Sequence, residues 1–479
     1  MSNQNEFDVI VIGSGPSGRT VSLRSIKNGL SVVLVEDELV GGDCHYYACI
    51  PSKAMLRPPE ALKEAQEIEG AKQAFTGQLG VEAVLNRRDA FADHWNDAKL
   101  QGMLEKGGVK VVHGHGRLDG ERRVIVTSPH NPDLMLIARH AVVVSTGSRA
   151  LIPGIPGLAE SKPWTNKNAT SSRKTPATLA IMGGGPVGCE MATAYSALGS
   201  KVTILERKER LLSRYEPFAG EELAKAFARR GISVLTGVSV VRVDRPEGAG
   251  GTEITLDDGS VVSADELLVA VGRRPNTDRI GLETVGFKPG EWLNVDDSCS
   301  VRETAGNWLY AVGDVNHRAL LTHVGKYQAR ACAATIAARV HGDTMGDQTA
   351  HWSKFRATTD HTAVPQVIFS DPQVATVGLT EAAARAMKMN AKAVDCDMGA
   401  VEGAKLHTDG YVGDAKIIID ENRHVLVGAT FIGPQVGDLL HAATTAIVGE
   451  VPLDGLWHAI ACFPTVSEVW LSLLENYGY

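Results

Sequence analysis

The stretch FDVIVIGSGPSG, residues 7–18, decides the predicted fold of this chain. Residues 7–12 form a short apolar run rich in β-branched side chains, which is typical of a buried parallel strand. Gly13, Gly15 and Gly18 follow, and a helical pattern begins after them. In such a turn the first glycine permits the bend, the second lets a pyrophosphate approach the backbone, and the third allows close helix packing. The stretch therefore predicts a dinucleotide-binding βαβ unit.

The same arrangement returns later in the sequence at a constant offset. A second apolar run, ATLAIM at residues 177–182, leads into a second glycine turn. The glycines of that turn are Gly183, Gly185 and Gly188. The second strand of each unit ends on a glutamate, Glu36 or Glu206, which can accept hydrogen bonds from an adenosine ribose. One glycine signature is weak evidence, but two in the same internal register predict two nucleotide sites.

A close pair of cysteines lies in the segment GGDCHYYACIPSK, residues 41–53. Cys44 and Cys49 are near enough in sequence to form a disulfide, although not from opposite faces of a regular helix. Downstream of a dinucleotide signature, such a pair suggests a disulfide that accepts electrons. Two other interpretations stay open: a structural disulfide, and zinc bound by both cysteines and His45, for which no fourth ligand is evident. We expect no metal.

Composition and charge argue against several functional classes. The 479 residues are too many for one core, and 44% hydrophobic with 22% charged residues is ordinary for an α/β protein. The net charge is -8 without a basic block, so nucleic acid is not an expected partner. No apolar run reaches the roughly 18 residues needed to cross a bilayer. The seven cysteines are scattered and odd in number, and MSNQNEF is no signal sequence, which predicts a cytoplasmic protein.

The remaining pattern suggests how the chain is divided. Residues 141–148 and 267–274 are similar strand-then-glycine segments, and residues 308–314 form another apolar strand that ends at Asp314. From residue 364, alternating strands around turns precede two helical stretches. We expect an α/β fold with two Rossmann-like dinucleotide-binding domains and a C-terminal α+β domain. The expected divisions are residues 1–150, 151–275, 276–345 and 346–479.

Together these residues resemble the pyridine nucleotide–disulfide oxidoreductase family, which includes dihydrolipoamide dehydrogenase, glutathione reductase and mercuric reductase. The resemblance covers essentially the whole chain. Its most specific motifs are GSGPSG, CHYYACIPSK, GGGPVGCE, VGRRPN, YAVGD and PTVSE. It implies FAD bound by residues 1–150 and 276–345, a nicotinamide nucleotide bound by residues 151–275, and dimerisation through residues 346–479. It also implies a homodimer in which the C-terminal domain of one subunit completes the active site of the other.

The resemblance also implies roles for individual residues. Cys49 would lie against the flavin as the charge-transfer thiolate, and Cys44 would exchange with substrate. Lys53 and Glu190 match an ion pair beside the flavin, where a lysine can stabilise negative charge on the reduced ring. The implied FAD contacts are Gly13, Gly15, Gly18, Glu36 and Asp314, and the implied nicotinamide nucleotide contacts are Gly183, Gly185, Gly188 and Glu206. Further expected cofactor contacts are Gly42, Lys53, Gly116, Thr146, Gly147 and Gly272.

Glu206 also bears on the choice of nicotinamide nucleotide. A carboxylate hydrogen-bonds a free ribose and repels a 2′-phosphate, which favours NAD over NADP. The basic residues that follow are Arg207, Lys208 and Arg210, which are either solvent-facing charges or a means of admitting NADPH. We expect NADH and leave NADPH open.

The C-terminal motif departs from the family pattern. Typical members carry a histidine immediately before its Pro-Thr, and a glutamate five residues later orients that histidine as the acid–base catalyst. Here Phe463 stands at the histidine position, while Glu468 is retained. Phenylalanine cannot transfer a proton, and losing a positioned acid–base group costs about 10²–10⁴-fold in rate. Cys462 is expected to be a buried structural thiol, with a third redox cysteine as the alternative.

Three explanations for Phe463 stay open. Another group could replace the histidine, and the candidates, each more often a packing residue, are His458, His45, Tyr46 and Tyr47. The acceptor could need no proton from the enzyme, as with a quinone or a metal ion. Alternatively, Phe463 excludes protons, as in 2-ketopropyl-coenzyme M oxidoreductase/carboxylase, which has histidine where this chain has Glu468.

The predicted function is therefore enzymatic: NAD(P)H-dependent reduction of a small-molecule acceptor through FAD and the Cys44–Cys49 disulfide. Reductive thioether cleavage with carboxylation and quinone or metal-ion reduction are the enzymatic alternatives. A redox-sensing flavoprotein is the alternative outside enzymes.

Overall fold

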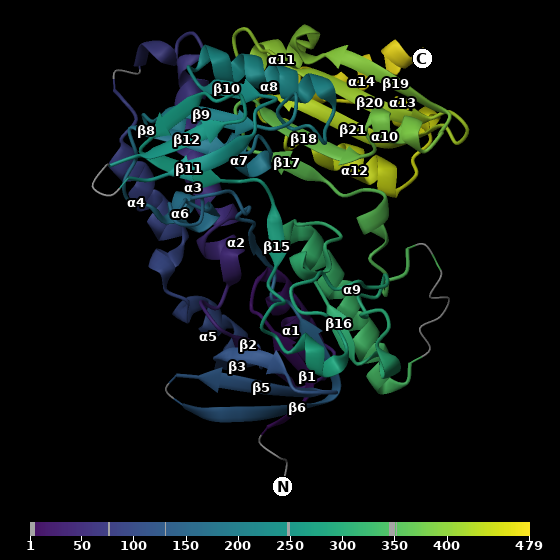
Figure 1. Ribbon diagram of the computed structural model, residues 1–479. Helices are drawn as coiled ribbons and strands as arrows, with labels where there is room; N and C mark the ends of the chain where they lie inside the picture. Colours follow the sequence, from purple (N-terminus) through teal and green to yellow (C-terminus); the bar gives the residue numbers. More distant parts are fainter. Residues whose placement is uncertain (1–4, 75–76, 130, 247–249, 344–349, 351) are drawn as a thin grey trace. The chain divides into compact units, whose positions relative to one another are not determined.

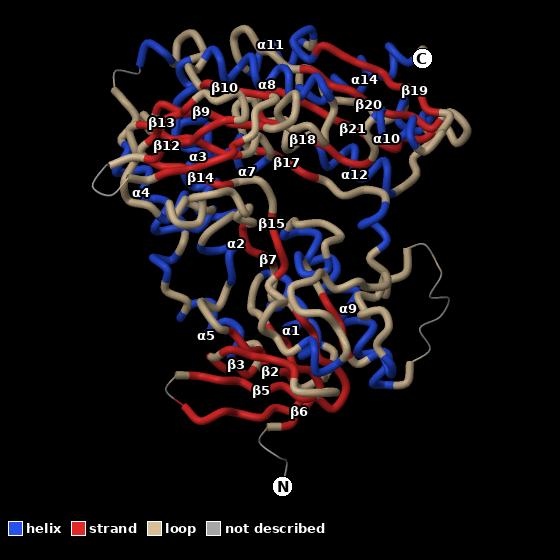
Figure 2. The backbone as a smooth tube through the Cα atoms, viewed as in Figure 1, coloured by secondary structure: helices blue, strands red, loops and turns tan. Residues whose placement is uncertain are grey.

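The computed structural model describes residues 5–74, 77–129, 131–246, 250–343, 350 and 352–479. Helices and strands occur along the whole described chain (Figures 1 and 2), and they alternate in residues 6–36 and 178–236. It divides into two compact units. Unit 1 contains Met1–Pro51, Asp89–Ala150 and Gly272–Asp360, and unit 2 contains Ser52–Arg88, Leu151–Val271 and His361–Tyr479. The predicted boundary between residues 345 and 346 lies outside the described residues.

Unit 1 is built on a largely parallel sheet. Its strands run in the order β3 (Lys110–His113), β2 (Val32–Glu36), β1 (Glu6–Ile12), β6 (Asn131–Val144), β5 (Arg123–Ser128) and β4 (His115–Leu118), and β16 (Leu309–Ala311) pairs with β6. β1 is parallel to both neighbours, so Ile10 lies between Val33 and Val142. The strand predicted from the opening stretch is thus central in the sheet, which explains its unbroken apolar run.

Helices and a two-stranded ribbon complete unit 1. They are α1 (Pro16–Lys27), α2 (Gly42–Tyr46), α5 (Ala98–Lys106), α9 (Thr322–His341), β7 (Ser148–Ala150) and β15 (Arg273–Pro275). α1 begins at the first glycine turn, with Pro16 at a position where the missing N–H is tolerated. A Cβ atom on Gly18 would lie 1.9 Å from the carbonyl oxygen of Gly13. Only glycine therefore lets this helix approach the strand so closely.

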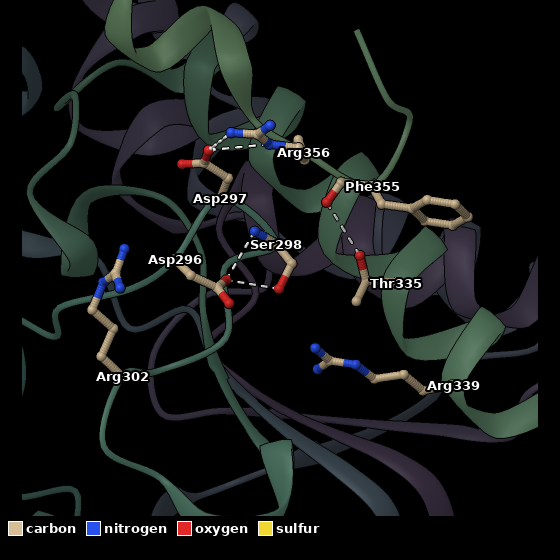
Figure 3. A pocket seen from close by; sticks show the side chains of 8 residues that line it. All are labelled: Asp296, Asp297, Ser298, Arg302, Thr335, Arg339, Phe355 and Arg356. Carbon is tan, nitrogen blue, oxygen red and sulfur yellow. Dashed lines mark hydrogen bonds and ion pairs between the residues drawn. The ribbon is translucent and has the colours of Figure 1, made fainter. Parts of the chain in front are cut away.

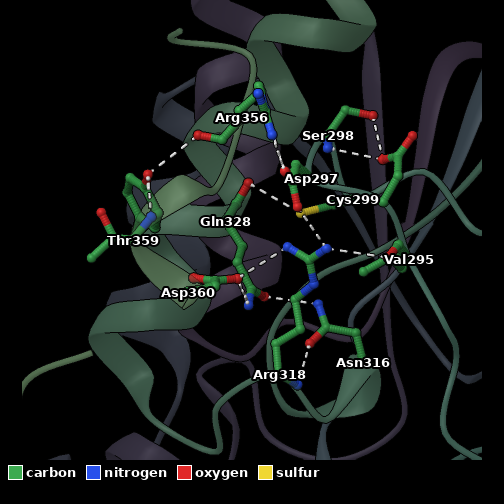
Figure 4. A network of polar contacts seen from close by, with 12 residues as sticks. Val295, Asp297, Ser298, Cys299, Asn316, Arg318, Gln328, Arg356, Thr359 and Asp360 are labelled. Carbon is green, nitrogen blue, oxygen red and sulfur yellow. Dashed lines mark hydrogen bonds and ion pairs between the residues drawn. The ribbon is translucent and has the colours of Figure 1, made fainter. Parts of the chain in front are cut away.

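Charged side chains hold the loops of unit 1 together (Figure 4). Asp297 accepts a hydrogen bond from Arg318 at 2.9 Å, and Arg318 also lies 3.5 Å from the carboxylate of Asp360. Asp360, whose side chain is 1% exposed, accepts a hydrogen bond from Gln328 on α9 at 2.7 Å. Gln328 in turn accepts the backbone N–H of Gly313 at 2.9 Å. The network therefore fixes the loop that leads to Asp314.

Unit 2 contains the second parallel sheet. Its strand order is β10 (Ser233–Thr236), β9 (Lys201–Glu206), β8 (Thr178–Met182) and β14 (Glu266–Val269), and α7 (Pro186–Ala197) and α8 (Pro217–Arg229) follow β8 and β9. An antiparallel sheet is formed by β11 (Val240–Asp244), β12 (Thr252–Leu256) and β13 (Val261–Ala264). The segment from β8 through α7 to β9 is the second βαβ unit that the repeated glycine signature predicts.

The C-terminal part of unit 2 is an antiparallel sheet with helices. The strand order is β17 (Gln366–Ile368), β18 (Gln373–Gly378), β21 (Val425–Gly433), β20 (Asp414–Asp420) and β19 (Ala391–Asp397). Its helices are α10 (Glu381–Ala386), α11 (Glu402–His407), α12 (Leu440–Val448), α13 (Leu453–Trp457) and α14 (Val469–Tyr477). The other helices that contribute to unit 2 are α3 (Cys49–Gln66), α4 (Val81–Phe91) and α6 (Asn166–Ser171). The predicted α/β class with a C-terminal α+β part is confirmed.

Short 3₁₀ turns complete the secondary structure of the described residues. They are η1 (Lys72–Ala74), η2 (Asp93–Trp95), η3 (Leu282–Val285), η4 (Ala305–Asn307), η5 (Asp314–Asn316), η6 (Thr358–His361), η7 (Met398–Ala400) and η8 (Val466–Glu468). Within the described part of the chain, every helix is too short or too polar to cross a membrane.

Candidate active site

The two cysteines of the central segment meet where α2 gives way to α3. Cys44 lies in α2, Cys49 is the first residue of α3, and their sulfurs are 2.9 Å apart as free thiols. Tyr47, with φ −137°, ends α2 and supplies the helix break that lets the two side chains face each other. A disulfide is about 2.05 Å long. The sulfurs are therefore placed to form one with a small displacement.

A hydroxyl from the first turn of α9 reaches both sulfurs. Thr322 Oγ1 donates to Cys44 Sγ at 3.0 Å and lies 3.3 Å from Cys49 Sγ. The hydrogen bond to Cys49 raises the pKa of the Cys44 thiol, and burial raises it further, while Thr322 and the charge of Arg19 act in the opposite direction. The first two effects are the larger, so the pKa of Cys44 is raised and its protonated form is favoured. The role of Cys49 as the thiolate stays a prediction.

Two of the side chains between the cysteines, those of His45 and Tyr46, have polar partners within the protein. His45 Nε2 lies 2.9 Å from Asp93 Oδ2. Tyr46 is fully buried, its hydroxyl donates to the carbonyl oxygen of Val40 at 3.2 Å, and burial raises its pKa to about 12. Tyr46 therefore belongs to the core and stays protonated at neutral pH. Tyr47 is half-buried.

The predicted ion pair of Lys53 and Glu190 is formed in unit 2. Lys53 lies one helical turn after Cys49 on α3, and its Nζ is 2.7 and 2.9 Å from the two carboxylate oxygens of Glu190 on α7. The Glu190 side chain is 10% exposed, and it also accepts the backbone N–H of Phe369 at 3.1 Å. Lys53 Nζ lies 4.7 Å from the centre of the Phe369 ring. Phe369 thus contacts both members of the pair. The role of the pair in catalysis stays a prediction.

The first glycine turn offers the features that a dinucleotide needs. Gly15 precedes α1, no described side chain caps that helix, and a Cβ atom on Gly15 would meet open space. Free N–H groups at a helix N-terminus favour a phosphate. Glu36 accepts hydrogen bonds from Ser14, through its N–H at 2.7 Å and its hydroxyl at 2.5 Å, which orients the carboxylate at the turn. Thr146 Oγ1 is buried without a hydrogen-bond partner among the described residues. These features fit FAD.

Asp314 is not part of the predicted strand: β16 ends at Ala311, and Asp314 begins η5, where it lies in a polar cluster. It accepts a hydrogen bond from the Ser148 hydroxyl at 2.6 Å, and Arg273 Nε lies 3.7 Å from its carboxylate. Arg273 also donates to Ser148 Oγ at 2.6 Å and lies 3.5 Å from Asp43. The predicted ligand Asp314 is thereby oriented by two residues that the sequence did not single out.

The other predicted cofactor contacts differ in their surroundings. Gly42 has φ +66°, and a Cβ atom there would lie 2.8 Å from the Cα atom of Gly15. Gly147 has φ +70° and open space beside it, and Gly272 has φ +146°. Gly116 lies inside β4, where a Cβ atom would crowd the core. The first three are backbone positions that favour glycine, whereas Gly116 has a sufficient explanation in packing.

The second glycine turn repeats the geometry of the first. Gly185 precedes α7 with open space beside it, and a Cβ atom on Gly188 would lie 1.9 Å from the carbonyl oxygen of Gly183. Glu206 Oε2 accepts the backbone N–H of Gly184 at 2.6 Å. These residues fit a second dinucleotide. Their binding roles stay predictions.

The basic residues after Glu206 divide into two kinds. Arg207 and Lys208 are exposed, whereas Arg210 donates to the carbonyl oxygens of Ser213 and Tyr215, each at 3.2 Å. Arg210 therefore has a structural partner, and Arg207 and Lys208 are the residues free to approach a 2′-phosphate.

The C-terminal motif is exposed in this chain. Phe463 is 75% exposed, and Glu468 accepts the backbone N–H of Gly403 at 3.3 Å. The expectation that Cys462 is a buried thiol is wrong, because the segment before α14 is at the surface and leaves this cysteine exposed. His458 is exposed as well, so it does not fill a core position.

A cavity of about 230 Å³ opens elsewhere in unit 1 (Figure 3). Its lining residues are Asp296, Asp297, Ser298, Arg302, Thr335, Arg339, Phe355 and Arg356. None of them is a predicted site residue. Among the residues that the structure describes, no three or more His, Cys, Asp and Glu side chains form a group suited to hold a metal ion.

Three residues near the cysteines escaped the sequence-based prediction. Thr322 carries no motif signal, because a single threonine at the start of a helix is common. Arg273 is part of VGRRPN, and Arg19 directly follows GSGPSG, so their positions next to motifs were the available signal.

Comparison with known proteins defines the class of enzyme. Residues 7–332 match the family model described as pyridine nucleotide-disulphide oxidoreductase, and residues 364–473 match the dimerisation domain of that family. The chain belongs to this family, whose members are FAD- and NAD(P)H-dependent oxidoreductases. It is therefore a flavoenzyme.

Individual relatives span the whole chain. The dihydrolipoyl dehydrogenase of Chlamydia trachomatis is 30% identical, over 97% of this chain and 95% of the relative. The mercuric reductase of Shigella flexneri is 31% identical, over 96% of this chain and 78% of the relative. The solved structure of flavoprotein disulfide reductase RclA from Escherichia coli, a Cu(II) complex, has a TM-score of 0.83 with 22% identity, covering 98% of this chain and 99% of that one. LpdA from Mycobacterium tuberculosis has a TM-score of 0.81 with 22% identity, covering 98% and 100%. Both of these solved structures share the fold of this chain.

Proposed function

We propose that this enzyme uses Cys44 and Cys49 as a redox-active disulfide that passes electrons from NAD(P)H to a small-molecule acceptor. The observation that carries the proposal is the sulfur–sulfur distance of 2.9 Å, with Thr322 Oγ1 in reach of both atoms. A structural disulfide would need neither a hydroxyl aimed at its sulfurs nor a nucleotide turn nearby in the chain.

The chemistry of the pair follows from its electrostatics. FAD, when bound, supplies the two-electron chemistry that connects the nicotinamide nucleotide to the disulfide. Two electrons break the S–S bond, and uptake of one proton leaves one thiol and one thiolate. Cys44 keeps this proton because its hydrogen bond to Cys49 and its burial raise its pKa. Reoxidation by the acceptor removes two electrons, forms the S–S bond again and releases the proton.

We further propose that Phe463 occupies the family's histidine position and restricts the acceptor. A phenyl ring provides no proton, and Glu468, which would orient a histidine, accepts a backbone N–H instead. Acceptors that take electrons without protonation by the enzyme, such as quinones or metal ions, are therefore favoured over disulfides. Relatives of this chain include mercuric reductases, which is consistent with such an acceptor.

Purified enzyme tests the proposal with a panel of acceptors under anaerobic conditions. The panel contains mercuric ion, quinones, lipoamide, glutathione disulfide, and a 2-ketoalkyl thioether with bicarbonate. We expect turnover of a proton-independent acceptor that is lost in Cys44→Ser and Cys49→Ser, with flavin content unchanged. Full turnover in both serine variants would mean that electrons reach the acceptor without passing through the cysteines. Turnover of glutathione disulfide at the fastest rate would contradict the role of Phe463.

Several further expectations are part of this proposal. NADH is the preferred donor, the enzyme is a cytoplasmic homodimer whose C-terminal domain completes the partner's site, and the four-part domain division holds. Size-exclusion chromatography with light scattering measures the oligomeric state, and the ratio of kcat/KM for NADH and NADPH measures the donor preference.

A further inference from the structure

Three guanidinium groups line the cavity of Figure 3 in unit 1. Arg339 comes from the last turn of α9, Arg302 from a turn before β16, and Arg356 from the segment that follows α9. In the view of Figure 3, Arg302 and Arg339 approach the cavity from opposite sides. The acidic lining residues are Asp296 and Asp297, so the wall carries one positive charge in excess. Its charge therefore favours an anion.

The two aspartates of the cavity have donors of their own. Asp297 accepts hydrogen bonds from Arg356 Nη2 at 2.6 Å and from Arg318 Nη2 at 2.9 Å. Asp296 Oδ1 accepts the backbone N–H and the hydroxyl of Ser298, at 2.9 and 2.7 Å. Arg356 is thus paired with Asp297, and neither of these carboxylates forms an ion pair with the other two guanidinium groups of the cavity.

Neutral groups hold Arg302 and Arg339 in place. Arg302 Nε donates to the carbonyl oxygen of Val295 at 3.2 Å, and Arg339 Nη1 donates to the Tyr310 hydroxyl. The Arg339 guanidinium also lies 5.7 Å from the centre of the Tyr310 ring, and Tyr310 is buried. A guanidinium has five N–H donors. Each of the two groups is therefore positioned by one contact and keeps further donors for a ligand.

The cavity is remote from the cysteines and from the features that fit FAD. A Cβ atom on Gly325, in the first turn of α9, would collide with the Ser17 hydroxyl at the start of α1. This end of α9 thus lies beside the first glycine turn, and it carries Thr322, which reaches the cysteines. Arg339 lies about 25 Å further along the helix axis, at a rise of 1.5 Å per residue. A ligand in the cavity is therefore distinct from an acceptor that meets the cysteines.

We propose that this cavity is a second binding site, in which Arg302 and Arg339 hold the phosphate or carboxylate group of a small molecule. The planar guanidinium matches the paired oxygens of either group. The walls are joined by hydrogen bonds, since Thr335 Oγ1 donates to the carbonyl oxygen of Phe355 at 3.3 Å and Arg356 bonds to the loop at Asp297. The site is therefore formed before the ligand arrives, which lowers the cost of binding. It does not depend on the proposed role of the cysteines.

Isothermal titration calorimetry of the FAD-loaded enzyme tests the site. Inorganic phosphate and succinate are the probes, and sodium chloride keeps the ionic strength constant so that screening does not change. We expect saturable binding of at least one probe, and the tighter of the two identifies the anionic group. Arg339→Met and Arg302→Gln should each weaken this binding by about 10–100-fold, the loss expected for hydrogen bonds to a charged group. Arg302 is exposed, so its replacement should leave the fold intact.

Matched variants separate this cavity from other anion sites. Arg24→Met removes an exposed arginine from α1 and should leave the affinity unchanged. Arg339→Lys keeps the charge but loses the paired donors, so its affinity should lie between those of Arg339→Met and the unaltered protein. Phosphate also suits the glycine turns, so only binding that is weakened in Arg302→Gln is assigned to the cavity. Unchanged affinity in Arg302→Gln overturns the proposal even if Arg339→Met fails to fold, and so does the absence of saturable binding of either probe up to about 10 mM.

Discussion

Removing Lys53 should destabilise the protein more than neutralising its partner Glu190. Lys53→Met leaves a carboxylate that is 10% exposed, with the Phe369 N–H as its remaining hydrogen-bond donor among the described residues. Glu190→Gln instead leaves a lysine whose side chain is 35% exposed and can be hydrated. Stranding the more buried charge is the costlier change.

The expected size follows from the geometry of the pair. Two unit charges 4 Å apart interact by about 4 kcal/mol at an effective dielectric constant of 20, and desolvation offsets much of this. Exposed pairs contribute about 0.2–1 kcal/mol, and breaking a buried pair costs about 3–5 kcal/mol. For this half-buried pair we expect losses of about 2–3 kcal/mol in Lys53→Met and about 1 kcal/mol in Glu190→Gln. The double variant should lose about 1–2 kcal/mol less than the sum of the two.

Thermal unfolding of the four proteins at equal concentration measures these differences. A loss of 1 kcal/mol lowers the midpoint by about 2–4 °C in domains of 150–250 residues. Lys27→Met, which changes an exposed lysine on α1, is the control and should leave the midpoint unchanged. Additive losses, with a coupling below about 0.3 kcal/mol, would show that the two charges do not stabilise each other.

Three further experiments, with five substitutions in all, test the site. Phe463→His should raise turnover of a disulfide acceptor by about 10²-fold, because it restores a proton donor, whereas Phe463→Leu should not. An unchanged rate in the histidine variant would argue against a missing proton donor as the reason for slow disulfide reduction. Gly15→Ala should fold normally and lose FAD affinity, whereas Gly18→Ala should lose folded protein as well, because of the 1.9 Å contact at that position. Circular dichroism measures folding and the flavin content measures FAD binding. Equal behaviour of the two variants would contradict the assignment of this turn to FAD. Glu206→Gln should lower kcat/KM for NADH relative to NADPH by about 10-fold, since one good ribose contact is worth about 1.4 kcal/mol; an unchanged ratio removes Glu206 from donor selection.

The local sequence pattern was sufficient to predict the two βαβ units and the close approach of the two cysteines. An apolar run followed by spaced glycines has one stable arrangement, because a Cβ atom on Gly18 or Gly188 would collide with the preceding turn. A departure from a regular helix between the cysteines was expected too, since two cysteines at this spacing cannot meet on opposite faces of one helix. The structure places the break at Tyr47.

Contacts between distant parts of the chain could not be derived in this way. Thr322 reaches Cys44 only because α9 packs against α1, and neither residue type nor spacing encodes that contact. The burial of single residues could not be predicted from the sequence either. Cys462 was expected to be buried and is exposed, whereas Tyr46, a candidate proton donor, is fully buried. Free cysteines are usually buried, but the position of a segment at the surface overrides that tendency.

If Cys44 and Cys49 form the redox-active disulfide, the first two electrons from NADH should end on these two sulfurs. One equivalent of NADH is added anaerobically to the oxidised enzyme, and new thiols are then alkylated and identified by mass spectrometry. We expect labelling at both cysteines while most of the flavin absorbance is retained, together with a long-wavelength thiolate–flavin band. Full bleaching of the flavin with both cysteines unlabelled would contradict it.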